Sequence, residues 1–362
     1  MAAQALVLGY FGAKNWGDDL ILESFLRAYR EVLEPAGIAL TVTVKQPPSR
    51  AYQEELRALF PHISFTPVSP LLPTALRFSK HRFLFCPGGS LLQNATSNRS
   101  LLYYLSVISR FTVRGRRAFM LNQGIGPITG QRYLEATRRV LARIALFTAR
   151  DQDTLAWVRE NAPECRTQLA SDGVFACDQP FTVREAVRPK KALVFALREG
   201  IAEEAMEFTI SSVPRTHSVF LAALQAADLH YLRELRTRTV FPHERVEVLG
   251  AAEFARRLPG CALCVSERYH GLIAAMLARV PYVGIGDDPK IISFCKETGM
   301  PYFVRDALHE ATAEDLLARA QAAYNQERLD AVAAAYRQRQ QQQRELVASL
   351  IRELEPSATT AD

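Results

Sequence analysis

The sequence predicts an α/β protein of two Rossmann-like lobes, each with a parallel sheet, on three observations. Its 362 residues exceed what a single hydrophobic core usually serves. Short apolar runs alternate with helical segments along most of the chain, which is typical of βαβ units. This alternation is interrupted at residues 179–191, where prolines and charges cluster. We therefore expect a first lobe over residues 1–180 and a second over residues 190–312.

The first lobe is expected to begin with a buried strand, a glycine-containing turn and a helix whose apolar residues recur at helical spacing. The same order of elements then repeats through the lobe. The predicted strands cover residues 5–9, 40–44, 83–86, 117–122 and 144–148, and the predicted helices cover residues 20–33, 53–59, 101–110, 133–142 and 153–160.

The second lobe repeats this order, with an irregular stretch at residues 198–216 that we expect to form a loop. Its predicted strands cover residues 192–197, 246–249, 262–265 and 282–285, and its predicted helices cover residues 271–278 and 290–296.

The segment after the second lobe is rich in Ala, Gln, Glu and Arg and is expected to be helical over residues 313–355. Leu346, Val347, Leu350 and Ile351 form an apolar stripe near its end, so we expect this segment to pack back on the first lobe. We interpret the run of glutamines at residues 340–343 as a solvated helix face.

Composition excludes several classes of function. The apolar fraction of 48% and the charged fraction of 23% are ordinary for a globular protein. A net charge of +6 permits anionic ligands without selecting one. Zinc-finger spacing, a basic zipper and an aromatic RNA-binding signature are all missing, so a nucleic-acid partner is not expected.

The N-terminal residues lack a basic region followed by a long apolar core, so a secretory signal is not expected. We found no apolar stretch of transmembrane length in the sequence. The expected location is the cytoplasm, where peripheral contact with the inner face of the membrane is compatible with the basic balance.

Six cysteines include a C-x-x-C at Cys261 and Cys264. This spacing is found in redox and metal sites, but here it runs into an apolar, strand-like segment. A second such pair or a nearby histidine pair, which would complete a zinc site, is missing. Buried reduced thiols are therefore expected, with neither a metal nor a cofactor.

Open α/β sheets bind ligands at the carboxyl ends of their strands. The first such end, residues 9–19, is rich in glycine, which lets the backbone approach a ligand closely. It has neither dinucleotide nor P-loop spacing. Asn15 and Asp18 are the candidates here for contacting substrate, and a helix cap by Asp18 or Asp19 is the structural alternative.

The second end carries Gly88, Gly89 and Ser90, dense in backbone and hydroxyl donors that suit an anion or a sugar. A tight turn followed by a capped helix would also explain them. The next strand ends deliver Gln123 and Arg150. An arginine at such a position needs an anionic partner, which is either a substrate or a neighbouring aspartate such as Asp151 or Asp172.

In the second lobe a strand end carries Arg268 and His270, and the following one carries Lys290. His270 opens a helix, where the helix dipole favours its neutral form, so it could exchange protons near neutral pH. We therefore predict that His270 is a proton-transferring group.

Together these motifs resemble the polysaccharide pyruvyltransferase family, with the greatest likeness to the branch that pyruvylates secondary cell-wall polymers. The resemblance rests on Gly-Gly-Ser-Leu-Leu-Gln at residues 88–93, Arg-Ser-Leu-Leu-Tyr-Tyr at residues 99–104, and Arg-x-His-Gly at residues 268–271 with Asp-Pro-Lys at residues 288–290. The chain departs from the family's usual residues at Asp19 and Tyr269, and residues 198–247 match poorly.

The resemblance implies two lobes like those of GT-B glycosyltransferases, with phosphoenolpyruvate bound in the cleft between them. It implies a cyclic pyruvate ketal formed on an aminosugar, often carried on a lipid, with release of phosphate. Arg150, Arg268 and Lys290 would then bind the donor, His270 would transfer a proton, and Asp18 would act on an acceptor hydroxyl.

Two other functions stay open on the sequence. A nucleotide-sugar glycosyltransferase would use the same cations to bind a diphosphate, although we find no clear acidic residue placed to hold a ribose. A non-catalytic sugar-binding protein is the second, although Arg150, His270 and Lys290 are all retained. The identity of the sugar, the bridged hydroxyls and the oligomeric state do not follow from the sequence.

Overall fold

The computed structural model describes residues 3–68, 78–95, 97–113, 116–177, 192–200, 203–239, 245–304, 307–308 and 311–353. The expected boundary at residues 179–191 lies outside them. The chain divides into two compact units, one of residues 1–13, 18–177 and 335–362 and the other of residues 14–17 and 178–334. Two segments are therefore grouped differently from the expected lobes, namely the short stretch 14–17 and the terminal helical region, which is divided after residue 334.

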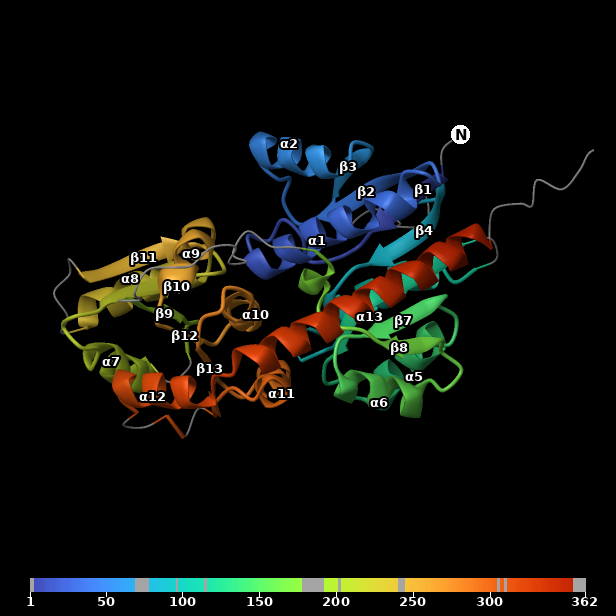
Figure 1. Ribbon diagram of the computed structural model, residues 1–362. Coiled ribbons are helices and arrows are strands. Elements are labelled where there is room, and N and C mark those ends of the chain that lie inside the picture. Colours follow the sequence, from blue (N-terminus) through green and yellow to red (C-terminus); the bar gives the residue numbers. More distant parts are fainter. Residues whose placement is uncertain are drawn as a thin grey trace, which may run out of the picture. The chain divides into compact units, whose positions relative to one another are not determined.

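The first unit is built on an eight-stranded parallel sheet in the order β3-β2-β1-β4-β6-β7-β8, with β5 paired to β6 (Figure 1). The strand order reverses direction at β1 and β4, where open sheets of this kind bind ligands. The strands are β1 (Ala3–Val7), β2 (Ile38–Val44), β3 (Ile63–Pro67), β4 (His81–Cys86), β5 (Gly89–Leu92), β6 (Arg117–Ile125), β7 (Leu146–Ala149) and β8 (Thr167–Leu169).

Both faces of this sheet are buried, because alternate residues of its strands belong to two different core clusters. Leu84 and Cys86 belong to the cluster that contains residues of α4 (Asn98–Ser109), α5 (Gln131–Leu141) and α6 (Gln152–Asn161). Phe83 and Phe85 belong to the cluster with residues of α1 (Trp16–Leu33), α2 (Arg50–Leu59) and the end of α13 (Gln326–Arg352).

The second unit has a six-stranded parallel sheet in the order β11-β10-β9-β12-β13-β14. Its strands are β9 (Ala192–Ala196), β10 (Ser218–Ala223), β11 (Val246–Gly250), β12 (Leu263–Ser266), β13 (Tyr282–Ile285) and β14 (Tyr302–Phe303). Its helices are α7 (Glu203–Ser211), α8 (Asp228–Arg238), α9 (Ala251–Arg257), α10 (Tyr269–Leu277), α11 (Pro289–Thr298), α12 (Ala313–Ala323) and the first residues of α13. The two strand-order reversals, at β1/β4 and β9/β12, make both sheets Rossmann-like.

The strands and helices predicted from apolar periodicity are present with small shifts at their ends. Several short elements were missed, namely β3, β5, β8, β10, β14, α8 and α9. The expectation of a loop at residues 198–216 was wrong where α7 forms, because its Met206 and Ile210 are buried against the second unit's core.

The interpretation of the glutamine run as a solvated face was also wrong. Gln340 and Gln343 are 5% and 0% exposed, whereas Gln341 and Gln342 face solvent. The end of α13 packs Val347, Leu350 and Ile351 into the core of the first unit. This turns one side of the helix inward, including the two glutamines.

The cysteines of the C-x-x-C are both buried and unbridged. Burial raises the pKa of the Cys264 thiol well above its ordinary value, which keeps it protonated. Among the helices that the structure describes, none combines the length and the apolar character needed to cross a membrane.

Candidate functional site

Arg150 follows the end of β7 and lies at the carboxyl edge of the first sheet. Its backbone N–H donates to the carbonyl of Gln123, at the neighbouring end of β6, over 2.9 Å. Its side chain is 6% exposed, and its Nη2 lies 3.5 Å from the Ser90 hydroxyl. A Cβ on Gly124 would lie 2.5 Å from Nη2 and 2.7 Å from Ser90 Oγ, so only glycine leaves room for this pair.

Two aspartates lie beside this guanidinium. Nε of Arg150 is 3.6 Å from Asp151 Oδ2, and Nη1 is 3.9 Å from Asp172 Oδ2. Both separations exceed hydrogen-bonding distance, so the aspartates orient the arginine through charge. Each aspartate also accepts a backbone N–H, Asp151 from Thr154 at the start of α6 and Asp172 from Val174. Both structural partners considered from the sequence therefore lie near Arg150.

The structural alternative for the Gly88–Ser90 segment, a tight turn followed by a capped helix, holds only in part. Gly89 has a φ of +91°, which favours glycine, and starts the short strand β5 that pairs with β6. The helix α4 begins later, capped by Ser97, whose Oγ accepts from the N–H of Ser100 over 3.4 Å. The glycines and Ser90 therefore stay at the sheet edge beside Arg150.

Gln123 lies in the same place but faces inward. It is 1% exposed, and its Nε2 donates to the carbonyls of Cys86 and Gly88 over 3.0 and 2.9 Å. The sequence predicted that Gln123 binds substrate directly. In the structure its amide instead holds the turn that follows β4, so we interpret it as a residue that shapes the site.

The N-terminus of α1 begins earlier than expected. The helix starts at Trp16, and the Asn15 side chain accepts from the N–H of Gly17 over 3.3 Å. Asp18 and Asp19 therefore lie within the first turn, and the suggestion that either one caps the helix was wrong. Carboxylates in the first turn of a helix interact favourably with the positive end of the helix dipole.

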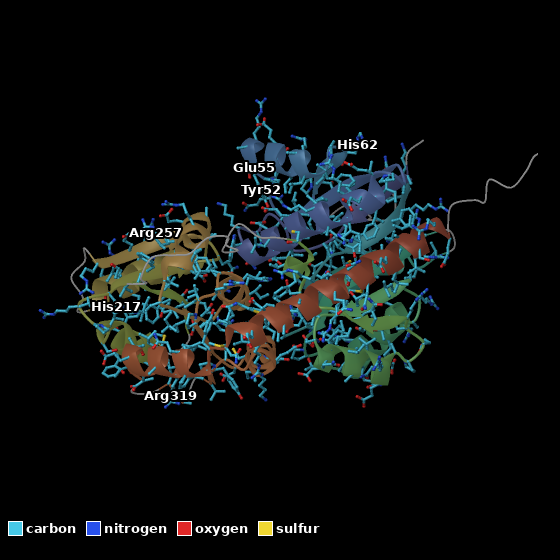
Figure 2. The ribbon with its side chains drawn as sticks, viewed as in Figure 1. Tyr52, Glu55, His62, His217, Arg257 and Arg319 are labelled. Carbon is cyan, nitrogen blue, oxygen red and sulfur yellow. The ribbon has the colours of Figure 1, made fainter. Side chains whose placement is uncertain are left out.

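Asp19 lies in an acidic neighbourhood. Burial, with Asp18 and Glu23 as weaker contributors, raises its pKa from 3.8 to about 7. Glu23 also has a raised pKa because it is buried, and its carboxylate accepts from the Tyr52 hydroxyl over 3.0 Å. Tyr52 lies on α2, one turn before Glu55 (Figure 2).

Residues 14–17, which end with the first two residues of α1, are part of the second unit, and we call them the strap. The N–H of Trp16 donates to the carbonyl of Leu224 over 3.0 Å, just past the end of β10, and Asn15 forms an isolated bridge with Gln225. The Trp16 ring meets Phe254 edge-on with centroids 5.5 Å apart. These contacts attach the strap to the carboxyl edge of the second sheet.

His270 lies in the first turn of α10, packed directly against the strap. A Cβ on Gly17 would lie 2.0 Å from its Nδ1, so no larger residue fits there without displacing the imidazole. The ring also contacts Tyr269, with centroids 5.4 Å apart. In the chain, Gly17 is followed directly by Asp18, the other predicted catalytic residue.

Arg268 precedes α10 and is bound by Asp228, a residue of α8 that sequence reasoning missed. Its Nε donates to Asp228 Oδ2 over 3.1 Å, and its Nη2 contacts Oδ1. Asp228 is 2% exposed and also accepts from the N–H of Gln225. This ion pair occupies the guanidinium that the sequence assigned to the donor, so the structure favours a role for Arg268 in holding α10 to α8.

Glu267 is a second residue that the sequence did not single out. It is buried just past the end of β12, and its Oε2 accepts from the N–H of Arg198 over 2.8 Å, just beyond the end of β9. The two strands flank the point where the order of the second sheet reverses. Glu267 therefore fixes the sheet edge on which α10 and His270 begin.

Lys290 lies in the first turn of α11, after β13. Its Nζ is 2.8 Å from Oδ2 of Asp288, the residue that caps the helix by accepting from the Lys290 N–H. The side chain is about one-third exposed. Lys290 is therefore the more accessible of the two predicted cations of the second unit.

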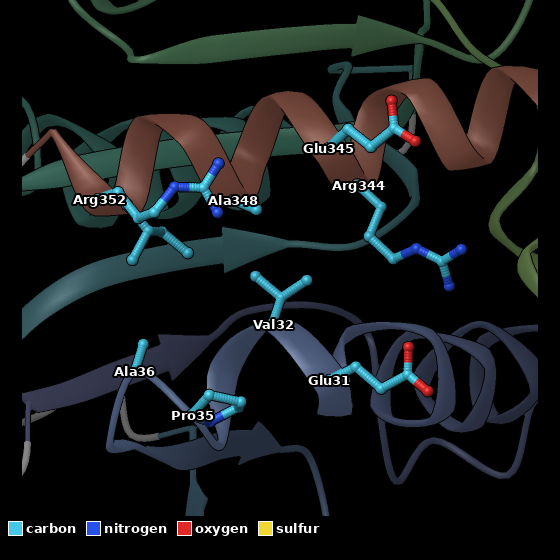
Figure 3. A pocket seen from close by; sticks show the side chains of 9 residues that line it. Glu31, Val32, Pro35, Ala36, Arg344, Glu345, Ala348 and Arg352 are labelled. Atoms are coloured by element: carbon cyan, nitrogen blue, oxygen red, sulfur yellow. The ribbon is translucent and has the colours of Figure 1, made fainter.

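A cavity of about 430 Å³ lies elsewhere in the first unit, between the last turns of α1 and α13 (Figure 3). Val32 and Ala36 line one side, and Arg344, Ala348 and Arg352 line the other. Because α1 starts at the carboxyl end of β1, its last turn lies toward the opposite edge of the sheet. This cavity is therefore separate from the residues around Arg150.

Within the first unit, the structure thus gathers Gly88, Gly89, Ser90, Gln123 and Arg150. Within the second, it gathers Asn15, Arg268 and His270, with Lys290 at the next strand end. Among the described residues, no group of three or more His, Cys, Asp or Glu side chains is arranged to hold a metal ion.

Solved structures with the same architecture include a complex with UDP and a putative epimerase. HepE of Anabaena, in complex with UDP, has a TM-score of 0.63 and 13% identity, covering 96% of this chain and 100% of that chain. A putative UDP-N-acetylglucosamine 2-epimerase from Listeria monocytogenes has a TM-score of 0.61 and 13% identity, with 98% of both chains covered. These similarities show the fold, which is that of GT-B glycosyltransferases and epimerases.

A search of curated proteins finds no match to this chain. The family model described as polysaccharide pyruvyl transferase matches residues 15–289, a range that begins in the strap and includes Arg150, Arg268 and His270. This range covers most of the chain and most strands of both sheets, which identifies the protein as a transferase acting on a sugar. The chain therefore belongs to the polysaccharide pyruvyl transferase family.

Proposed function

We propose that this protein transfers a pyruvyl group from phosphoenolpyruvate to a sugar of a cell-surface polysaccharide precursor. The product is a cyclic pyruvate ketal, and inorganic phosphate is released. The observation that carries the proposal is the family match over residues 15–289, which includes Arg150 and His270 at strand ends of the two sheets. No cofactor is needed for this chemistry.

The donor carries a carboxylate and a phosphate, both of which suit charge-assisted hydrogen bonds from arginine. Arg150 lies at the carboxyl edge of the first sheet, beside the Ser90 hydroxyl and the Gly88–Gly89 backbone. We propose that this group binds one anionic end of phosphoenolpyruvate. Lys290 is proposed as a second cation for the donor, whereas the pairing of Arg268 with Asp228 supports an indirect role for Arg268.

The proposed reaction begins with protonation of C3 of the enol, which leaves a cation-like centre at C2. One sugar hydroxyl adds to C2 and loses its proton, and the C2–O bond to phosphate then breaks. A second hydroxyl of the same sugar adds to C2 and loses its proton to the released phosphate. We propose that His270 delivers the proton to C3 and that Asp18 orients or deprotonates an acceptor hydroxyl.

The acceptor is proposed to be an aminosugar, carried on a lipid in the manner of the branch that modifies secondary cell-wall polymers. A lipid-linked acceptor would bring the protein to the inner face of the membrane from the cytoplasm. The net charge of +6 favours such contact with an anionic surface.

The alternative is a nucleotide-sugar glycosyltransferase, which the fold of the UDP-bound neighbour also accommodates. The likeness is 13% identity and therefore supports the alternative as a fold only. The two functions differ in donor: one releases phosphate from phosphoenolpyruvate and the other releases a nucleoside diphosphate.

The test is phosphate release from phosphoenolpyruvate with and without a panel of lipid-linked and synthetic aminosugars. We expect acceptor-dependent release, reduced about a hundredfold to ten-thousandfold in His270→Ala. His230→Ala, at an exposed position of α8, is the matched control and should retain the native rate. Turnover of a UDP-sugar in place of phosphoenolpyruvate would instead establish the glycosyltransferase.

A further inference from the structure

The buried glutamines Gln340 and Gln343, which we call the glutamine pair, belong to α13 but bind the carboxyl edge of the first sheet. Gln340 Nε2 donates to Asn122 Oδ1 over 2.9 Å and to the carbonyl of Ser171 over 3.0 Å. Gln343 Nε2 donates to the Tyr29 hydroxyl over 3.0 Å, and its Oε1 accepts from Thr148 Oγ1. A buried amide is costly without such partners. The partners come from β6, β7, α1 and the segment after β8.

One partner of Gln340 leads to the turn after β4. Asn122 has a φ of +56°, which is uncommon for a residue other than glycine, and its Nδ2 donates to the carbonyl of Pro87 over 3.2 Å. A Cβ on Gly173 would lie 3.0 Å from this Nδ2 and 3.2 Å from that carbonyl, so the packing is close. Gln340 therefore supports the residue that holds the turn just before Gly88.

The other partner leads to Arg150. Ser171 accepts from Gln340 through both its carbonyl and its hydroxyl, and its own hydroxyl donates to the Tyr336 carbonyl of α13 over 3.2 Å. The next residue is Asp172, whose carboxylate lies 3.9 Å from Arg150. The helix thus fixes the backbone from which the buried carboxylate reaches the guanidinium.

General stabilisation of the fold explains these contacts less well. Val347, Leu350 and Ile351, later on the same helix, already bury apolar surface in the core of the first unit. A buried amide together with its partners adds little net stability over apolar groups of the same shape, but the amide fixes the position of its partners through directional bonds. The two buried glutamines of α13 instead contact the ends of the strands that carry the candidate donor site.

We infer that Gln340 is a positioning residue for the donor site, which sets Asp172 and the Pro87–Gly88 turn so that Arg150 and Ser90 meet the anion of phosphoenolpyruvate. The inference rests on the proposed function, since it concerns the same donor. It adds a contribution from the C-terminal helix, which the family match over residues 15–289 does not include.

The test compares Gln340→Leu with Gln341→Leu, an exposed glutamine one position further along the same helix. For each full-length protein we would measure the Kd for phosphoenolpyruvate by calorimetry, the KM for donor and for acceptor, and the midpoint of thermal unfolding. Gln340→Leu should remain folded and weaken donor binding by about tenfold, which corresponds to about 1.4 kcal/mol. The acceptor KM should stay at the native value, and Gln341→Leu should match the native protein throughout.

A purely structural role predicts a lower unfolding midpoint with native donor affinity in the folded fraction, and that result would overturn the inference. If Gln340→Leu does not fold, Ser171→Ala removes one acceptor of Gln340 while it deletes only a hydroxyl, and it should weaken donor binding in the same direction. Native donor affinity in Ser171→Ala would then overturn the inference. Failure of the native protein to bind phosphoenolpyruvate would remove the proposed function as well, so the two failures are distinguishable.

Discussion

The carboxyl edges of the two sheets are held in contrasting ways. In the first unit, the turn after β4 and the ends of β6 and β7 are held by neutral amides, those of Gln123 and of the glutamine pair, although Arg150 itself lies beside two aspartates. In the second unit, the start of α10 is fixed by charged groups, the Arg268–Asp228 pair and the carboxylate of Glu267. Each edge carries residues that the sequence assigned to the reaction.

The difference between amides and charged groups predicts how much stability each edge loses when one partner is removed. Neutral amides cost less to bury than ions, so the loss of one hydrogen-bond partner lowers the free energy of unfolding only modestly. A buried carboxylate or guanidinium that loses its partner leaves an uncompensated charge, which costs more. Mutations that break the ion pair of the second edge should therefore destabilise the protein more than mutations of the amides of the first edge.

The largest effect is expected for Asp228→Ala. Loss of the carboxylate leaves the Arg268 guanidinium without its bidentate partner and the N–H of Gln225 without its acceptor. We expect the free energy of unfolding in urea to fall by about 3 kcal/mol. The control is Asp330→Ala, which breaks an exposed pair with Arg279 and should cost less than about 1 kcal/mol. Equal losses in the two variants would show that the second edge does not depend on its buried ion pair.

Gly17→Ala sharpens the comparison at the strap. The new methyl would collide with Nδ1 of His270, so the imidazole or the strap must move. Displacement of a catalytic group by about 1 Å can cost about a hundredfold in rate, and we expect a loss of turnover of that order. Gly250→Ala, where a Cβ would meet only open space, is the control. Native turnover in Gly17→Ala, measured as acceptor-dependent phosphate release, would argue against His270 as the proton-transferring group.

Gln343→Leu probes the amide-held edge. The hydroxyls of Thr148 and Tyr29 each lose a buried hydrogen-bond partner, so the free energy of unfolding should fall by about 2 kcal/mol. The exposed Gln342→Leu should leave it unchanged. A loss in Gln343→Leu larger than that in Asp228→Ala would reverse the comparison between the two edges.

The smallest effect concerns Asp19, whose pKa is raised from 3.8 to about 7. The native state holds this proton more tightly than the unfolded state does, so stability is lost as the pH rises from about 4 to about 7. Asp19→Asn should therefore stabilise the protein at pH 8 by about 1 kcal/mol, after allowance for solvent screening, and leave it unchanged at pH 4. Thermal unfolding at the two pH values, with the exposed Asp153→Asn as control, measures this. A gain of equal size at both pH values would exclude the ionisation of Asp19 as its cause.

Much of the fold and of the candidate site followed from local patterns. Apolar periodicity predicted the long helices and the central strands, because one buried stripe or one buried strand is visible within a short window. Strand-end glycines and cations predicted Arg150 and His270, since parallel sheets place their ligands there. Short edge strands such as β8 and β14 were missed because three or two residues carry too little pattern.

The partners of the predicted residues were not predictable in the same way. Asp228 lies 40 residues from Arg268 in the chain, and its helix was not recognised. Gln123 was identified as a ligand-contacting residue because it ends a strand. Only the structure shows that its side-chain amide donates to the carbonyls of Cys86 and Gly88, at the turn after β4.

The sequence by itself determined the two parallel sheets, the family motifs and the positions of the candidate catalytic groups. It also held one signal that was overlooked, because the buried side of α13 recurs at alternating spacings of four and three residues through the glutamine run, at Leu329, Ala333, Tyr336, Gln340, Gln343, Val347 and Leu350. Only the tertiary structure decided that the two glutamines on this stripe are buried. Their burial requires acceptors and donors as far as 314 residues away in the chain, and no local pattern specifies groups at that distance.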